Sequence, residues 1–147
     1  MSMFSAFNIN ASGLTAQRYR MDIISENVAN ANTTRVDDGE PYRRKVVTFA
    51  QKGEQYSFSR ILSHAAKDYT GRGVKVAGVY EDRETPMNKV YDPAHPDADE
   101  NGYVLYPNVN IVMEMTNLID ASRAYEANST AFSASKAMAL QGLEMSK

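Results

Sequence analysis

The sequence predicts an α+β fold in which long N- and C-terminal α-helices pair as a coiled-coil-like hairpin, with a small β-rich module between them. Apolar residues near both ends of the chain recur every seven residues, which is helical spacing. The middle instead contains short runs in which apolar and polar residues alternate, together with all five prolines and most of the glycines. We therefore expect an N-terminal helical part at 1–33, a β-rich middle at 34–107 and a C-terminal helical part at 108–147.

The C-terminal part gives the strongest helical signal. It contains no proline and no glycine before Gly142, and at 1.5 Å per residue such a helix is roughly 50 Å long. Asn110 is suited to cap its start, with Pro107 just outside. The residues on its seven-residue line are Ile111, Leu118, Tyr125, Phe132 and Ala139.

The N-terminal part repeats this pattern more weakly. Gly13 and several Asn and Ser residues lower its helix propensity, so in isolation this segment is expected to fray. The residues on its seven-residue line are Phe7, Leu14, Met21 and Val28, with Ile24 and Ala31 each three residues after Met21 and Val28.

A second stripe on the C-terminal helix indicates further neighbours. Between Ala127 and Leu143 the only charged residue is Lys136, which is unusual for a helix with a face in water. The stripe consists of Ala124, Ala127, Ala131, Ala134 and Met138. One interpretation is a single antiparallel hairpin that leaves these alanines exposed. We favour enclosure of the helix by other subunits, because Ala121, Asn128 and Ser135 would make a poor two-helix core.

The middle part is expected to form short strands. The β-like runs are Lys45–Phe49, Tyr56–Ile61 and Val74–Tyr80, and residues 91–110 are expected to be mostly loop with a short strand at Tyr103–Leu105. The core of this module is predicted on Val47, Phe49, Phe58, Ile61, Val76 and Val79.

Composition excludes several classes of function. The formal net charge of −2 does not favour nucleic acid or an acidic membrane surface. No apolar run approaches the roughly 18 residues of a membrane span, and the first residues resemble no cleavable secretion signal. Cysteine is absent, so disulfides and thiol chemistry are excluded.

No catalytic, cofactor or metal site is predicted. Residues 97–102 match the first six positions of a calcium-binding EF-hand loop, but position twelve is Asn108 where a glutamate is required, so an acidic turn is favoured. His64 and His95 are too far apart in sequence to indicate a zinc site. A metal-dependent enzyme that uses the loop at 92–101 is therefore the weakest alternative.

Four segments carry a resemblance to a known family, which covers essentially the whole chain. Residues 11–34 (ASGLTAQRYRMDIISENVANANTT), which include Asn27 and Asn30, resemble the motif shared by the flagellar rod and hook axial proteins. Three further segments are more specific, and they resemble the proximal-rod subunits of that family. They are GEPYRRK at 39–45, YDPAHPDADENGYVLYPNVN at 91–110 and EMTNLIDASRAYEANSTAFSASKAM at 114–138. Ala94 stands where this resemblance predicts glycine.

The resemblance implies a structural subunit of the flagellar basal-body proximal rod. Such a protein is exported through the flagellar type III apparatus and polymerises into a drive shaft that transmits torque and forms the export channel. The implied partners are copies of itself, the rod subunits FlgB, FlgF and FlgG, and FliE. The terminal helices would form the inner core domain, with the β-rich middle outside them. The alternatives are another flagellar axial subunit or, in a different class, a cytoplasmic homo-oligomeric coiled-coil adaptor.

The residues predicted to contact other subunits all lie on the two terminal helices. They are Phe7, Leu14, Met21, Ile24, Asn27, Val28, Asn30, Ile111, Leu118, Ala124, Tyr125, Ala127, Ala131, Phe132, Ala134 and Met138.

Overall fold

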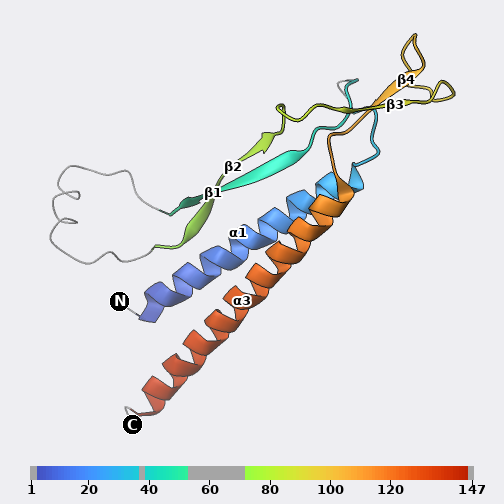
Figure 1. The fold of residues 1–147 in the computed structure, drawn as a ribbon. Helices are drawn as coiled ribbons and strands as arrows, with labels where there is room; N and C mark the ends of the chain where they lie inside the picture. Colours follow the sequence, from blue (N-terminus) through green and yellow to red (C-terminus); the bar gives the residue numbers. More distant parts are fainter. Residues whose placement is uncertain (1–2, 37–38, 53–71, 146–147) are drawn as a thin grey trace, which may run out of the picture.

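The computed structural model describes residues 3–36, 39–52 and 72–145, and it confirms the α+β prediction. In chain order, a small module of antiparallel strands lies between two long helices (Figure 1). The elements in chain order are α1 (Met3–Ala29), β1 (Lys45–Gln51), β2 (Val74–Glu81), β3 (Asn88–Tyr91), β4 (Tyr103–Tyr106) and α3 (Ile111–Glu144).

Helices α1 and α3 run antiparallel and pair along the length of α1. The rings of Phe7 and Phe132 meet edge to face with centroids 5.2 Å apart at one end, and Asn27 is hydrogen-bonded to Glu114 at the other. Helix α3 has 34 residues against 27 in α1. In this register the last turns of α3 extend beyond the start of α1, and both chain termini lie at this end (Figure 1).

Side chains define where the helices begin and end. Asn110 is the N-cap of α3, as predicted, because its side-chain oxygen accepts a hydrogen bond from the backbone N–H of Met113 at 3.2 Å. Helix α1 ends at Ala29, and the side-chain amide of Asn30 donates to the carbonyl of Glu26 at 3.0 Å. The backbone N–H of Asn30 donates to the same carbonyl at 3.0 Å, so Asn30 holds the last turn of α1 with two hydrogen bonds.

The strands form two separate two-stranded sheets. Strand β1 pairs antiparallel with β2 from Lys45↔Glu81 to Gln51↔Val74, with an irregularity between Thr48 and Phe49. Strand β3 pairs antiparallel with β4. These strands confirm the predicted runs at 45–49, 74–80 and 103–105. The predicted run at 56–61 lies outside the described residues, and β3 was not predicted.

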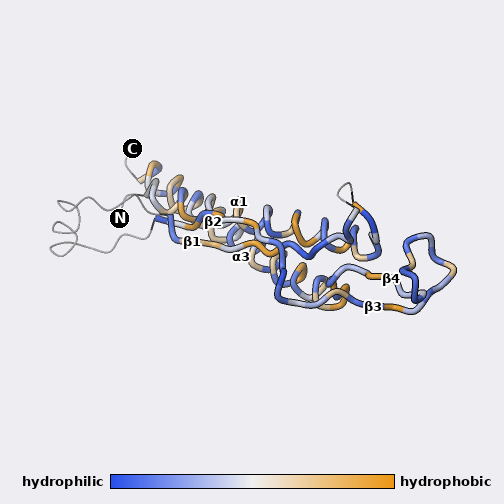
Figure 2. The backbone as a smooth tube through the Cα atoms, turned by 90° about the horizontal axis from the view of Figure 1, so that it is seen from above, coloured by the Kyte–Doolittle hydropathy of each residue, from blue (hydrophilic) through white to orange (hydrophobic). Residues whose placement is uncertain are grey.

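The core of the middle module differs from the prediction. Val47, Phe49, Val76 and Val79 are half-buried, because the β1–β2 ribbon packs on α1 and, among the described elements, contacts no second sheet. The other two predicted core residues, Phe58 and Ile61, lie outside the described residues. Among the described elements, α1 contacts β1, β2 and α3, whereas α3 contacts only α1. The β3–β4 hairpin projects past the end of the helix pair (Figure 2).

Candidate functional site

The seam between α1 and α3 is built from small side chains. Ala16 is 3% exposed, Ala121 is fully buried and Ser135 is 8% exposed. A Cβ atom added to Gly13 would lie 2.6 Å from Oδ1 of Asn128, so any larger residue at this position would require the Asn128 side chain to move. Sequence reasoning treated Ala121, Asn128 and Ser135 as a poor two-helix core. In the structure Ala121 and Ser135 are buried in this seam, and Asn128 is half-buried beside Gly13.

The predicted interface residues of α1 lie beside this seam as well as in it. Ile24 and Asn27 are buried. The others are half-buried: Phe7, Leu14, Met21, Val28 and, just after the end of α1, Asn30. The buried line of α1 also includes Gly13 and Ala16, so it lies next to the predicted seven-residue line and not on it.

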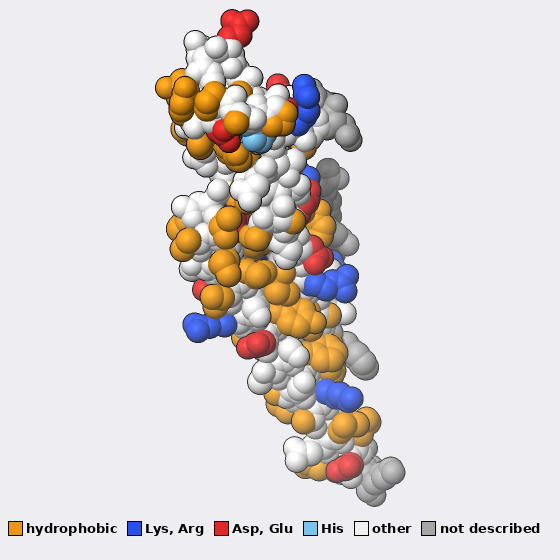
Figure 3. Space-filling model, turned by 90° about the vertical axis from the view of Figure 1, so that its right-hand side faces the viewer, with side chains coloured by type: hydrophobic (Ala, Val, Ile, Leu, Met, Phe, Trp, Pro, Cys, Tyr) orange, Lys and Arg blue, Asp and Glu red, His pale blue; other side chains and the backbone are white. Residues whose placement is uncertain are grey.

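The predicted interface residues of α3 fall into two groups. The half-buried ones flank the seam: Leu118, Ala124, Tyr125 and Phe132. The exposed ones face away from α1: Ile111, Ala127, Ala131, Ala134 and Met138. Further apolar side chains of α3 are exposed, among them Val112 at 73% and Ile119 at 54%. Apolar side chains consequently extend along the helix hairpin on the face drawn in Figure 3.

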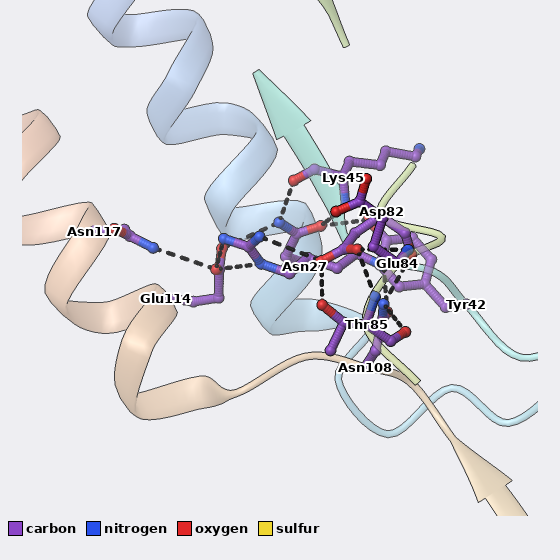
Figure 4. Close-up of polar contacts among 10 residues, drawn as sticks. Asn27, Tyr42, Lys45, Asp82, Glu84, Thr85, Asn108, Glu114 and Asn117 are labelled. Carbon is purple, nitrogen blue, oxygen red and sulfur yellow. Dashed lines mark hydrogen bonds and ion pairs between the residues drawn. The ribbon is translucent and has the colours of Figure 1, made fainter. Parts of the chain in front are cut away.

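A buried polar junction joins the helices to the strand module, and Asn27 is at its centre (Figure 4). The side-chain amide of Asn27 donates to the carbonyl of Lys45 at 2.8 Å and to Oε2 of Glu114 at 3.1 Å. Its side-chain oxygen accepts from the hydroxyl of Tyr42 and from the backbone N–H of Lys45, both at 2.9 Å. With 1% of its surface exposed, Asn27 therefore uses its full hydrogen-bonding capacity inside the protein.

Glu114 supplies the negative charge of this junction. It is 1% exposed, and its Oε1 accepts from Nε of Arg44 at 2.9 Å and from Nη2 of Arg44 at 2.8 Å. A buried carboxylate without a cation would be strongly destabilising, so Arg44 compensates a charge that could not otherwise be buried. The pair ties α3 to the segment immediately before β1.

Asn108 and Asp82 extend the junction to the loop after β2. Asn108 accepts from the backbone N–H of Arg44 at 2.9 Å and donates to the carbonyls of Asp82 and Thr85 at 2.9 and 3.2 Å. The Asp82 carboxylate accepts from the backbone N–H and the hydroxyl of Thr85. Both hydrogen bonds hold the pKa of Asp82 below its usual value, and the one from the backbone N–H has the larger effect.

Tyr42 is neutral in this environment. Burial, followed by the nearby carboxylates of Glu26 and Glu114, raises its pKa to about 12. The phenol therefore keeps the proton that it donates to Asn27.

A second connection holds β2 to α1 near the other end of the ribbon. The hydroxyl of Ser12 donates to the carbonyl of Ile9 at 2.7 Å and accepts from the backbone N–H of Val74 at 3.0 Å. Gly73 has φ +90°, and a Cβ atom there would lie 2.2 Å from Oγ of Ser12. Within the motif at 11–34, Ser12 thus binds β2 to α1, whereas Gly13 leaves room for α3.

Sequence reasoning did not identify Arg44, Tyr42, Asn108 or Glu114 as site residues. One signal was available for Glu114, because it lies on the same seven-residue line as Ala121, Asn128 and Ser135. A charged residue on a buried line requires a partner. No spacing rule could name Arg44 as that partner, since 70 residues separate the two.

In the acidic loop between β3 and β4, carboxylates accept hydrogen bonds that stabilise turns. Oδ1 of Asp99 accepts from the backbone N–H groups of Asn101 and Tyr103 at 2.8 and 2.9 Å. These hydrogen bonds lower the pKa of Asp99, that from Tyr103 most. Asp97 accepts from the Thr34 hydroxyl at 2.8 Å, which holds the loop to the turn after α1. Within 3–36, 39–52 and 72–145, no three acidic or histidine side chains gather in a way that could hold a metal ion. His64 lies outside the described residues.

Neither described helix is long and apolar enough to cross a membrane.

Comparison with protein families gives two matches. Residues 7–35 match the family described as flagella basal body rod protein, and residues 100–145 match the flagellar basal body rod FlgEFG protein C-terminal family.

Individual relatives match almost the whole chain. It is 48% identical over 153 residues to the flagellar basal-body rod protein FlgC of Bacillus subtilis, with all of both chains covered. It is 47% identical to FlgC of Borreliella burgdorferi over 94% of this chain and 93% of that protein. Identity to FlgC of Salmonella typhimurium is 40%, over 99% and 98% of the two chains. The chain therefore belongs to the FlgC family of flagellar basal-body rod proteins.

Proposed function

We propose that this chain is a structural subunit of the flagellar proximal rod, without enzymatic activity, and that the faces of α1 and α3 turned away from their shared seam contact other rod subunits. The main support is that the hairpin leaves a row of apolar residues of α3 exposed. Ala127, Ala131, Ala134 and Met138 are exposed, as are Val112 and Ile119. Exposed apolar surface on this scale is typical of an interaction face.

The polar junction suits a subunit that carries load. Four segments far apart in the sequence meet in it through hydrogen bonds and one buried ion pair, so the strand module is fixed to the helices at one defined angle. Buried polar groups of this kind favour one arrangement over near alternatives. We infer that torque entering the helices is transmitted through Glu114 and Arg44 to the strand module.

The proposed assembly partners are copies of this chain, FlgB, FlgF, FlgG and FliE, with delivery by the flagellar type III export apparatus. In this arrangement the helices would form the inner core domain of the rod, from 1–33 and 108–147, and the module at 34–107 would lie outside it.

Complementation tests the proposal directly. A Bacillus subtilis strain that lacks its own FlgC should regain motility when it expresses this chain, whereas an empty vector should not restore it. A chain that is expressed and folded but yields basal bodies without a rod would contradict the proposal. Sedimentation of the purified chain separates it from a cytoplasmic adaptor, because an adaptor should form a small closed oligomer.

Phe132→Ala is the informative variant in the same strain. The Phe132 ring packs on Phe7 near the terminal end of the hairpin and is only half-buried there. Its loss should block rod assembly while circular dichroism of the purified variant still shows a folded strand module. Normal motility, or loss of the strand signal, would contradict the assigned role.

A further inference from the structure

The last two turns of α3 form an apolar overhang, defined as Met138–Met145. Met138 is 63% exposed, Leu140 52% and Met145 88%. The only charge in the overhang is Glu144, and no basic residue lies in the last turn. A helix C-terminus carries partial negative charge, so a glutamate there is unfavourable unless a cation is supplied from elsewhere.

A groove of about 300 Å³ lies where β1 and the start of α3 both meet α1. Its apolar lining includes Ile23, Val47 and Phe49. Two of its cations are already paired, Arg44 with Glu114 and Lys45 with Glu26. The third lining cation, Arg20, forms no ion pair within the described part of the chain.

We propose that the overhang of one copy docks in this groove of a second copy, with Leu140 against the apolar lining and Glu144 facing Arg20. The inference rests on the proposed function as a rod subunit. The two surfaces complement each other, because an apolar helix end whose only charge is Glu144 meets a groove of mixed lining, in which apolar side chains lie beside Arg20, a cation without an ion pair among the described residues.

The overhang cannot fill the groove of its own chain. Asn117 lines the groove, and the continuous helix between it and Leu140 spans roughly 35 Å at 1.5 Å per residue. The contact is therefore heterologous, with a different surface used on each copy. Repetition of such a contact generates an open helical array and not a closed pair.

Cysteine cross-linking of the full chain tests the pairing. The chain has no native cysteine, so introduced thiols are the only ones present. One copy carries Ile23→Cys and the other Leu140→Cys, and circular dichroism first confirms that both variants fold. Mixed and oxidised, they should form a disulfide-linked pair, because a disulfide requires Cα atoms within about 7 Å. The matched control replaces Ile23→Cys by Lys75→Cys, which is exposed on β2, does not line the groove and lies outside the proposed interaction face.

Charge reversal gives the second readout. Arg20→Glu on the groove copy should lower the cross-linked yield about fivefold, the size expected when an exposed ion pair is replaced by like charges. Glu144→Arg on the overhang copy should restore that yield.

Four results would each overturn the pairing. They are equal yields from the groove and control positions, no cross-link at all, capture of a different protein by Ile23→Cys in cells, and no rescue by the double charge reversal. If this happens in a chain that still restores motility, the rod function stands and only the docking surface is wrong.

Discussion

Replacement of Asn27 by alanine should destabilise the chain by about 3–5 kcal/mol. The variant removes an amide that makes four hydrogen bonds and leaves two part-buried backbone groups of Lys45 without this partner. Each of these costs about 1 kcal/mol or more when unpaired, and the Glu114 carboxylate loses one of its donors at a further 1–3 kcal/mol. A loss of this size is a large fraction of the roughly 5–15 kcal/mol by which a typical domain is stable.

The assay is urea unfolding followed by far-ultraviolet circular dichroism. With a slope of about 1–3 kcal/mol per molar urea, the midpoint should fall by roughly 2 M with the slope unchanged. Asn8→Ala is the matched control, because Asn8 is exposed on the same helix and its replacement should change stability by no more than about 0.5 kcal/mol. Similar losses for both variants would show that Asn27 is an ordinary helical residue and that the junction does not hold the modules together.

Three further results are expected from the same contacts. Gly13→Ala should not stabilise the native chain, because the new Cβ meets Asn128 at 2.6 Å; in an Asn128→Ala background it should add about 1 kcal/mol of helix propensity, measured by a double-mutant cycle. Stability should fall as pH rises from 10 towards 12, because the folded state raises the pKa of Tyr42 from 10.0 to about 12 and the unfolded chain loses the proton first; Tyr42→Phe should flatten this slope in denaturation curves across that range. Amide exchange should be slowest near Glu114 and fastest beyond Phe132, because the junction closes only one end of the hairpin; uniform protection along α3 would contradict this.

Local signals in the sequence were sufficient for most of the secondary structure. The cap at Asn110 depends on a side chain and a backbone N–H three residues apart, so spacing alone could find it. The strands at 45–51 and 74–81 are rich in β-branched residues and were found for the same reason. Strand β3 was missed because it has four residues, all exposed, among prolines. Its pairing with β4 is what makes it a strand.

The polar junction could not be predicted in the same way. Asn27 was recognised only as part of a family motif, and its role depends on Tyr42, Lys45 and Glu114, which come from other segments. Each contact is set by the tertiary fold, and a sequence pattern records only that a polar residue occupies a position on a buried line. Such a residue is better treated as a sign of missing partners than as a defect in the helix.

The seam between the helices also depends on the tertiary fold, here through the size of its side chains. Ala121, Asn128 and Ser135 were predicted to make a poor core for an isolated helix pair, because such a core needs bulkier apolar residues. Gly13 and Ala16 instead let the backbones approach, so small residues fill the narrow space and the larger ones are displaced to its flanks. A seam of this kind buries little apolar area, and the bulky residues beside it remain partly exposed. Part of the hydrophobic stabilisation available to Phe7, Tyr125 and Phe132 is thus still unused in the single chain, and in our proposal it is gained when neighbouring subunits cover them.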